Sequence, residues 1–142
     1  MYVDPRGLRF AAAITTAVLG VVLVTGNAWL LAAQAAVFAI GAAAGLRFSP
    51  YSVVFRLLVR PRLGAPTELE AETPPRFAQA VGLGFAVIGV VGYAFGLPAL
   101  GIVATAFALA AAFLNAAFGF CLGCEMYLLI RRIVPNTKGV TT

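Results

Sequence analysis

The stretch LPALGIVATAFALAAAFLNAAFG, residues 97–119, decides the fold of this chain because it contains no charged side chain. A helix that crosses a membrane needs about 20 consecutive, mostly apolar residues. The whole chain shares this character, since 62% of its residues are hydrophobic and only 11% are charged. A soluble domain is nearer half apolar and a quarter charged. The sequence therefore predicts an integral membrane protein.

Three further windows have the length and apolar character of membrane spans, and all four are short of charges. The predicted spans cover residues 8–25, 28–46, 77–95 and 97–119. Short uncharged breaks separate the first from the second and the third from the fourth, which favours two tight helical hairpins. The first run leads into further apolar runs rather than into a cleavage site and a soluble domain. We therefore expect a retained span there, not a signal peptide.

The basic residues all lie outside the predicted spans and are distributed one-sidedly. They fall before the first span, between the second and third, and after the fourth: Arg6, Arg9, Arg47, Arg56, Arg60, Arg62, Arg76, Arg131, Arg132 and Lys138. Neither hairpin tip carries a charge. The positive-inside bias predicts a multi-pass protein of the cell membrane with both termini and the middle segment in the cytoplasm. The formal charge of +5 then reflects orientation, and we expect no nucleic-acid binding.

The segment between the two hairpins has two parts. Residues 50–60 place arginines among apolar pairs at helical spacing, which is typical of a helix lying in the headgroup region and ending before Pro61. Residues 63–76 are rich in Pro, Glu and Thr and predict an exposed linker. Its acidic residues, Glu68, Glu70 and Glu72, are expected to be solvated rather than functional.

The two halves of the sequence resemble each other weakly. RFAAA at Arg9 has a counterpart in RFAQA at Arg76, and Gly45 corresponds to Gly119. Each half then consists of a hairpin followed by a basic interfacial helix, the second expected over residues 125–134. An internal duplication in parallel orientation accounts for this pattern. Separate drift toward Ala, Gly and Val is the open alternative.

Both cysteines of the chain occur in FCLGCEMY, residues 120–127. One straight helix over residues 97–132 would be ~54 Å long, whereas the hydrocarbon core is only ~30 Å thick. A bend or break is needed, and Gly119 and Gly123 mark the expected place. Cys121 and Cys124 are therefore predicted at the cytoplasmic boundary, at the start of a new helix.

A Cys-x-x-Cys pair in this position is typical of a working dithiol. The free N–H groups and the dipole of a helix that begins there would favour a thiolate at Cys121. Cys121 is then the predicted nucleophile, Cys124 the resolving partner, and Glu125 a candidate proton relay. This chemistry requires no cofactor.

Two other interpretations of the cysteines remain open. Cys121 and Cys124 could bind a metal across a dimer, because such sites usually need four ligands and the chain has no histidine. They could also be packing residues. A quinone-linked thiol oxidase of the four-helix type is disfavoured, because those enzymes use a second cysteine pair and act on the oxidising side.

Small and polar residues within the spans are expected to serve helix packing. Two Gly-x-x-x-Gly pairs and three amide side chains are the candidates: Gly41 and Gly45, Gly92 and Gly96, and Gln34, Gln79 and Asn115. Such glycines allow close approach of helices, within the bundle or between protomers, and such amides bond between helices. Association of copies into a homo-oligomer is a further expectation.

Four stretches of the sequence resemble a known family: DPRGLRFAA, LVRPRLG, PPRFAQ and LNAAFGFCLGCEMYLL. They are similar to bacterial membrane proteins grouped as domain of unknown function 4395, over nearly the whole chain. The pattern of Phe120, Cys121, Gly123 and Cys124 is its most distinctive part. This resemblance implies thiol or sulfur handling beside a thioredoxin-like or sulfurtransferase protein.

The sequence as a whole predicts an all-α, four-helix membrane bundle of two hairpins, with short interfacial helices on the cytoplasmic side. The predicted function is that of a membrane-anchored dithiol protein that exchanges disulfides or handles sulfur with a cytoplasmic partner. The alternative is a non-catalytic structural or accessory subunit of the membrane.

Overall fold

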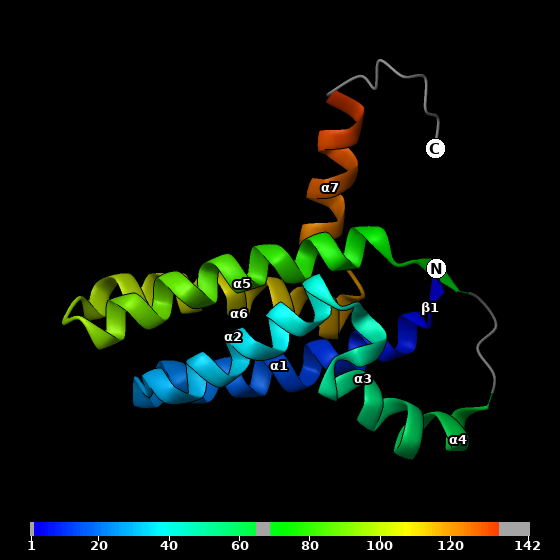
Figure 1. Ribbon diagram of the computed structural model, residues 1–142, viewed down its shortest axis with the longest axis horizontal. Helices are drawn as coiled ribbons and strands as arrows, with labels where there is room; N and C mark the ends of the chain where they lie inside the picture. Colours follow the sequence, from blue (N-terminus) through cyan, green and yellow to red (C-terminus); the bar gives the residue numbers. More distant parts are fainter. Residues whose placement is uncertain (1, 65–68, 134–142) are drawn as a thin grey trace.

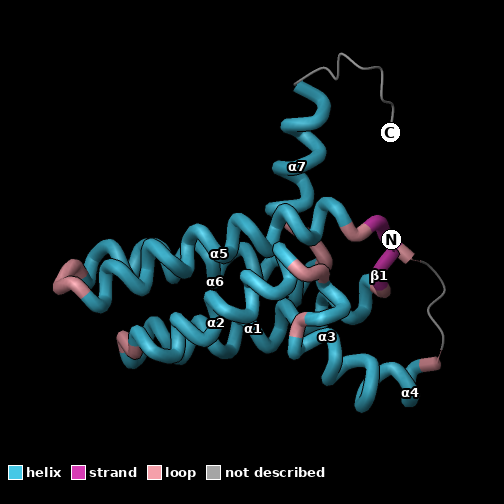
Figure 2. Tube along the Cα trace, in the orientation of Figure 1, coloured by secondary structure: helices cyan, strands magenta, loops and turns pink. Residues whose placement is uncertain are grey.

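Long apolar helices lie side by side and form two hairpins, as the computed structural model of residues 2–64 and 69–133 shows (Figure 1). The first hairpin contains α1 (Pro5–Thr25) and α2 (Ala28–Ala43), and the second contains α5 (Thr73–Ala94) and α6 (Pro98–Phe118). The two hairpins pack together, with α2 against α5 and α1 against α6. The fold is all-α, and Figure 2 shows how little of it is anything else.

Local sequence signals set the ends of the first hairpin. The Asp4 carboxylate accepts a hydrogen bond from the backbone N–H of Arg6, and Pro5 occupies the first turn of α1. These are favoured residues for the start of a helix. Gly26 ends α1 in the left-handed conformation, with φ of 66°. The side chain of Asn27 then caps α2 by accepting hydrogen bonds from backbone N–H groups in the first turn of that helix.

The core of the bundle lies where the four helices meet. Its buried apolar residues come from all four: Leu19, Val22, Leu31, Phe38, Ala86 and Ala108. Glycine allows the second hairpin to close tightly, because a Cβ atom at Gly92 would overlap the backbone of Gly101. The bundle is therefore held by close contact of small residues, as is usual between membrane helices.

The outer surfaces of these helices are apolar. The helices α1, α5 and α6 are each long and apolar enough to cross a membrane, whereas α2 is a shorter apolar helix. On α6, for example, Ile102, Val103 and Phe107 are exposed. A soluble protein would cover such a surface with charges. These helices indicate a multi-pass membrane protein.

The segment after α2 is helical and passes through a proline. It consists of a short 3-10 helix η1 (Leu46–Phe48), α3 (Pro50–Val54), the π-helical η2 (Phe55–Val59) and α4 (Arg60–Leu63). The sequence predicted an end before Pro61, but the helix continues to Leu63. The wider π turn lies just before the proline, which then occupies the first turn of α4, where a missing N–H is tolerated.

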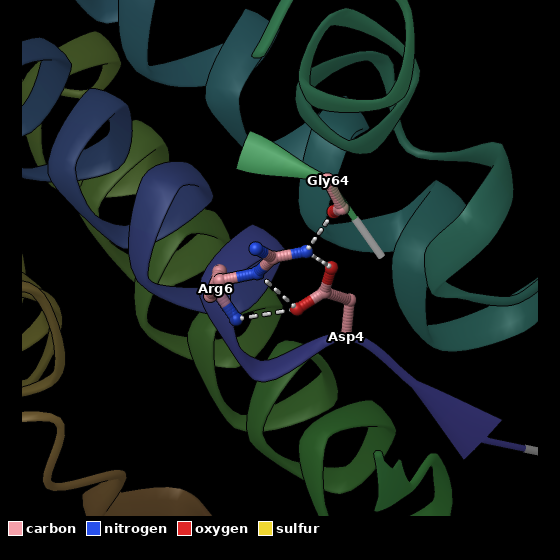
Figure 3. Close-up of polar contacts among 3 residues, drawn as sticks. All are labelled: Asp4, Arg6 and Gly64. Atoms are coloured by element: carbon pink, nitrogen blue, oxygen red, sulfur yellow. Dashed lines mark hydrogen bonds and ion pairs between the residues drawn. The ribbon is translucent and has the colours of Figure 1, made fainter. Parts of the chain in front are cut away.

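The N-terminus is tied to this connecting segment. The two-residue strands β1 (Tyr2–Val3) and β2 (Glu70–Ala71) pair in antiparallel orientation. Beside them the Arg6 guanidinium forms an ion pair with Asp4 at 2.9 Å and donates to the carbonyl oxygen of Gly64 at 2.9 Å (Figure 3). The hydrogen bond from Arg6 keeps the pKa of Asp4 below its ordinary value.

Some predicted boundaries shift in the structure. Helix α5 begins at Thr73, so the last residues of the predicted linker 63–76 are helical. Glu72 is buried rather than solvated, and its carboxylate accepts a hydrogen bond from the N–H of Leu46 at 2.9 Å. Residues 65–68, which include Glu68, and residues 134–142, which include Lys138, lie outside the described residues.

Candidate functional site

The two cysteines form a disulfide where α6 gives way to α7 (Leu122–Ile133). Gly119 ends α6 in the left-handed conformation, with φ of 68°, and so turns the chain. Cys121 directly precedes α7. Its Sγ accepts a hydrogen bond from the N–H of Cys124 at 3.1 Å, and its carbonyl oxygen accepts from the N–H of Glu125 at 3.0 Å. Cys121 therefore stands at the N-cap position of α7.

Contact with α5 fixes the start of α7. A Cβ atom at Gly123 would lie 2.6 Å from the Cβ and 2.7 Å from the Cα of Ala78, so the two helices touch backbone to backbone there. One turn further on, the rings of Tyr127 and Phe77 pack with centroids 5.5 Å apart. Beyond that contact α7 runs across the direction of α5 and away from the bundle (Figure 1). The glycine between the cysteines thus anchors the disulfide to the bundle.

The other side of the turn is held by an arginine from α1. The guanidinium of Arg9 donates to the carbonyl oxygens of Ala116 at 3.1 Å and Ala117 at 3.3 Å, near the end of α6. It also lies beside Gly119. Carbonyls in the last turn of a helix have no partner within the helix, and a cation there is favourable. Arg9 therefore supports the turn that positions Cys121.

The same contact occurs in the other half of the molecule. The guanidinium of Arg76, at the start of α5, donates to the carbonyl oxygens of Ala42 at 2.8 Å and Ala43 at 2.9 Å, at the end of α2. Arg9 and Arg76 are the first residues of the two copies of the RFA sequence. Each arginine caps the second helix of the opposite hairpin. These reciprocal arginine caps join the two hairpins.

A cavity of about 240 Å³ lies among the long helices and reaches the disulfide, since Cys121 is one of its lining residues. Its walls are mainly apolar, with three phenylalanines among them: Phe38, Phe85 and Phe107. Gln79, Asn115 and Tyr51 also line it. Burial raises the pKa of Tyr51, so its hydroxyl remains a neutral donor.

The residues predicted to pack helices occupy several different environments. Gln34 is buried, and its side-chain oxygen accepts from the Tyr51 hydroxyl at 2.7 Å. Its nitrogen is buried without a partner among the described residues. A Cβ atom at Gly41 would lie 2.9 Å from the side-chain oxygen of Gln79, which makes Gly41 a close contact between α2 and α5.

The remaining predicted glycines divide between contacts and turns. Gly92 meets Gly101, as described above. Gly45 and Gly96 both have positive φ, of 122° and 79°, and follow the ends of α2 and α5. The space around the Cβ position of Gly96 is open within 4 Å. Backbone conformation at these two turns is therefore what favours glycine there.

The cysteines in this state cannot ligate a metal, because a disulfide offers no thiolate. Within residues 2–64 and 69–133, His, Cys, Asp and Glu form no group of three or more that could hold a metal ion. A metal shared by two copies of the reduced protein stays a prediction. Glu125 lies exposed in the first turn of α7, and its predicted role as a proton relay stays a prediction too.

Sequence reasoning missed Arg9, Arg76 and Ala78 as parts of the site. The sequence indicates these arginines as markers of membrane orientation and of the internal repeat, but not as contacts of the site. Their position in the repeated RFA sequence was a signal that they make equivalent contacts. Ala78 carries no such signal, because its importance comes only from the approach of Gly123 in space.

The family described as Domain of unknown function (DUF4395) matches residues 3–132, which is most of the chain. The chain therefore belongs to this family. No curated protein and no solved structure matches it.

Proposed function

We propose that this member of the DUF4395 family is a membrane-anchored dithiol protein that exchanges disulfides with a soluble cytoplasmic partner through Cys121 and Cys124. The observation that carries the proposal is the disulfide itself, held at the N-cap of α7 and partly exposed. A packing disulfide would be expected inside the bundle. This one lies outside the long helices, on a turn supported from both sides.

Cys121 is the attacking sulfur in this proposal. In the reduced protein the N–H of Cys124 and the dipole of α7 favour a thiolate at Cys121. The thiolate attacks a disulfide of the partner, forms a mixed disulfide and releases one partner thiolate. Cys124, after losing its proton, attacks Cys121 in turn, which restores the Cys121–Cys124 bond and leaves the partner with two thiols. Glu125 is the candidate acceptor for the proton of Cys124.

Sulfur transfer is a variant of the same chemistry. Cys121 would then accept a sulfane sulfur from a donor and carry it as a persulfide. The family resemblance favours a thioredoxin-like protein or a sulfurtransferase as the partner. Both kinds of partner present a reactive cysteine to Cys121, so the same cysteine variants test both.

The bundle crosses the membrane four times in this proposal. Helix α2 has 16 residues and is ~24 Å long, somewhat less than the ~30 Å of hydrocarbon. It nevertheless packs between α1 and α5 and contains no charged residue. The basic ends of α1 and α5 lie at the same end of the bundle as α3, α4 and α7 (Figure 1). By the positive-inside rule that end is cytoplasmic.

Helix α7 and the helical segment from α3 to α4 lie at the cytoplasmic interface in this proposal. Helix α7 combines two arginines in its last turn with exposed apolar side chains: Leu128, Leu129, Ile130 and Ile133. Such a helix is stable with its apolar side in the acyl boundary and its charges among headgroups. Its direction across α5 suits a helix that lies along the membrane surface.

An internal duplication is part of the proposal, and the reciprocal arginine caps support it. Phe10 packs on Phe55 with ring centroids 5.6 Å apart, much as Phe77 packs on Tyr127 at 5.5 Å. In each half the phenylalanine after the capping arginine therefore contacts the interfacial helix that follows the hairpin.

Single cysteine variants test the proposed exchange. In membranes, Cys124→Ser should accumulate a mixed disulfide with its partner, because Cys121 can attack but nothing resolves the product. Cys121→Ser should form none. Mixed disulfides are measured by non-reducing electrophoresis and mass spectrometry after acid quenching.

The double variant, with serine at both positions, is the control for folding. Loss of mixed disulfides with an unchanged thermal unfolding midpoint supports exchange. Loss of stability without any mixed disulfide from Cys124→Ser would refute exchange and favour the structural, accessory role.

A further inference from the structure

We infer that the cavity among the long helices binds the ring of a lipid-soluble quinone, which accepts the electrons of the Cys121–Cys124 pair. This inference rests on the proposed function, because it assigns a second redox partner to the same cysteines. The cavity brings together apolar walls, unpartnered polar groups and a redox-active sulfur. An isoprenoid p-benzoquinone or naphthoquinone needs all three.

The size and walls of the cavity suit a single substituted ring. An engineered apolar cavity of about 150 Å³ in another protein is large enough for benzene. The volume of about 240 Å³ here therefore has room for a six-membered ring with its substituents. Phe85 and Phe107, whose ring centroids are 6.0 Å apart, and Phe38 line it. Aromatic side chains are the usual lining for a flat ring.

The polar groups suit the two oxygens of a quinone. The side-chain amides of Gln79 and Asn115 line the cavity, and neither forms a hydrogen bond within residues 2–64 and 69–133. Both residues are partly exposed, so their amides are open to a ligand that accepts a hydrogen bond. An acyl chain offers them nothing, and a peptide thiol such as glutathione is too polar for the walls. A quinone carbonyl accepts a hydrogen bond from an amide N–H.

The position of Cys121 places the redox centre at the cavity wall. In the reduced protein, the thiols of Cys121 and Cys124 lose two electrons and two protons and form the S–S bond. The quinone takes up both electrons and both protons, and its two carbonyls become the hydroxyls of a quinol. A dithiol on the soluble partner then reduces the Cys121–Cys124 disulfide by the proposed exchange run in reverse: one partner thiolate attacks Cys121 and displaces Cys124, and the second partner thiolate then releases Cys121 and closes the partner disulfide. Overall, a partner dithiol and a quinone become a partner disulfide and a quinol.

This scheme needs only one cysteine pair in the membrane protein. A second pair would be needed to carry electrons across a distance between the disulfide and the quinone. Here Cys121 belongs both to the exposed turn and to the cavity lining, so no relay is required. The single cysteine pair therefore does not by itself exclude quinone chemistry at this cavity.

The test measures electron transfer to ubiquinone-1 by the reduced protein in nanodiscs under anaerobic conditions. Loss of quinone absorbance reports the reaction, and the double serine variant provides the background rate. Ala112 lines the cavity, so Ala112→Phe should fill it and lower the rate at least tenfold. Ala110 is exposed on the same helix, so Ala110→Phe is the matched control and should keep the rate of the unaltered protein.

A second variant keeps the test decisive if Ala112→Phe does not fold. Asn115→Leu preserves approximate size and removes the amide, and it should weaken ubiquinone-1 binding in an equilibrium titration. Reduction of the disulfide by dithiothreitol is measured in the variants at residues 110, 112 and 115 and should stay unchanged.

The outcomes separate the two claims. Normal exchange with dithiothreitol but no electron transfer to ubiquinone-1 above background would overturn the quinone site and leave the proposed exchange standing. Equal rates for Ala112→Phe and the unaltered protein would also overturn it. Failure of the unaltered protein to exchange its disulfide with any dithiol would instead refute the proposed function.

Discussion

Asp4 has two separable roles, one as a helix cap and one as the charged partner of Arg6 (Figure 3). Asp4→Asn keeps an acceptor for the cap but removes the charge, whereas Asp4→Ala removes both. Loss of the cap should cost about 1 kcal/mol of stability at neutral pH. The thermal unfolding midpoint of Asp4→Asn should therefore lie between those of the unaltered protein and of Asp4→Ala.

The pKa of Asp4 gives this comparison a pH dependence. Because the folded pKa is lowered, the charged form stabilises the folded state fully above the ordinary value of about 4. That contribution is lost as the pH falls through the folded pKa. The advantage of the unaltered protein over Asp4→Asn should shrink over that acidic range. A difference that stays constant down to pH 2 would contradict the role of the charge.

At the scale of single residues, the sequence predicted that the cysteines lie at the start of a new helix, but not what holds them there. Gly119 and Gly123 were expected to permit a break because the apolar run is too long for one membrane span, and the chain does turn there. The disulfide state could not be predicted from spacing alone. The contact of Gly123 with Ala78 could not be predicted either, because it depends on how α7 meets α5.

At the scale of elements, the contact between α5 and α7 is the most sensitive joint. Gly123→Ala gains up to about 1 kcal/mol of helix propensity. It also places a Cβ atom against the backbone of Ala78, and such overpacking costs about 1–3 kcal/mol. The overlap should outweigh the propensity gain. We expect a lower thermal unfolding midpoint and faster reduction of the disulfide by dithiothreitol.

Two further variants check this explanation. Ala78→Gly combined with Gly123→Ala should restore part of the lost stability. The substitution at residue 78 removes its Cβ atom, which the new Cβ at residue 123 would overlap, but leaves its Cα in place. Gly84→Ala is the matched control on α5, where a Cβ atom meets open space, and its midpoint should not fall. An equal loss from Gly84→Ala would contradict an explanation based on local overlap.

The helical segment from α3 to α4 does not follow the rule that a proline ends a helix. Pro61 predicted a helix end because a proline within a helix removes a hydrogen bond and clashes with the preceding turn. The π-helical turn at Phe55–Val59 changes that spacing and lets the helix run on to Leu63. A π turn has no reliable sequence signal, so this difference could not be predicted.

At the scale of the whole molecule, the proposed four-span arrangement predicts which segments are accessible from each side. Starting from the double serine variant, one cysteine is introduced at an exposed position: Val24→Cys and Phe95→Cys at the two hairpin tips, or Leu63→Cys at the end of α4. In intact cells a membrane-impermeant maleimide should label the two tips. Residue 63 should be labelled only after lysis.

The labelling pattern also tests whether α2 spans the membrane. If α2 does not cross, the first tip and residue 63 lie on the same side and should respond alike. Labelling of Leu63→Cys before lysis would contradict the proposed orientation. Recovery of each variant in the membrane fraction is the control for insertion.

The overall arrangement was more predictable than its internal contacts. Apolar length and one-sided charge predicted long helices in hairpins, because a lipid environment permits few alternatives. The contact of Arg9 with Ala116 joins residues 107 apart in sequence, and the cavity depends on the packing of all four long helices. Such features arise only from the packing of the helices in three dimensions.

The reciprocal arginine caps have a consequence for the biogenesis of the protein. Arg76 is synthesised 34 residues after Ala42, so the sequence of the first hairpin is complete before its capping arginine exists. Until then the last carbonyls of α2 lack their cation, and the last carbonyls of α6 later depend on an arginine made at the very start. Neither hairpin is finished on its own. We therefore expect insertion into the bilayer and completion of the fold to be separate events, the second being the docking of one hairpin onto the other.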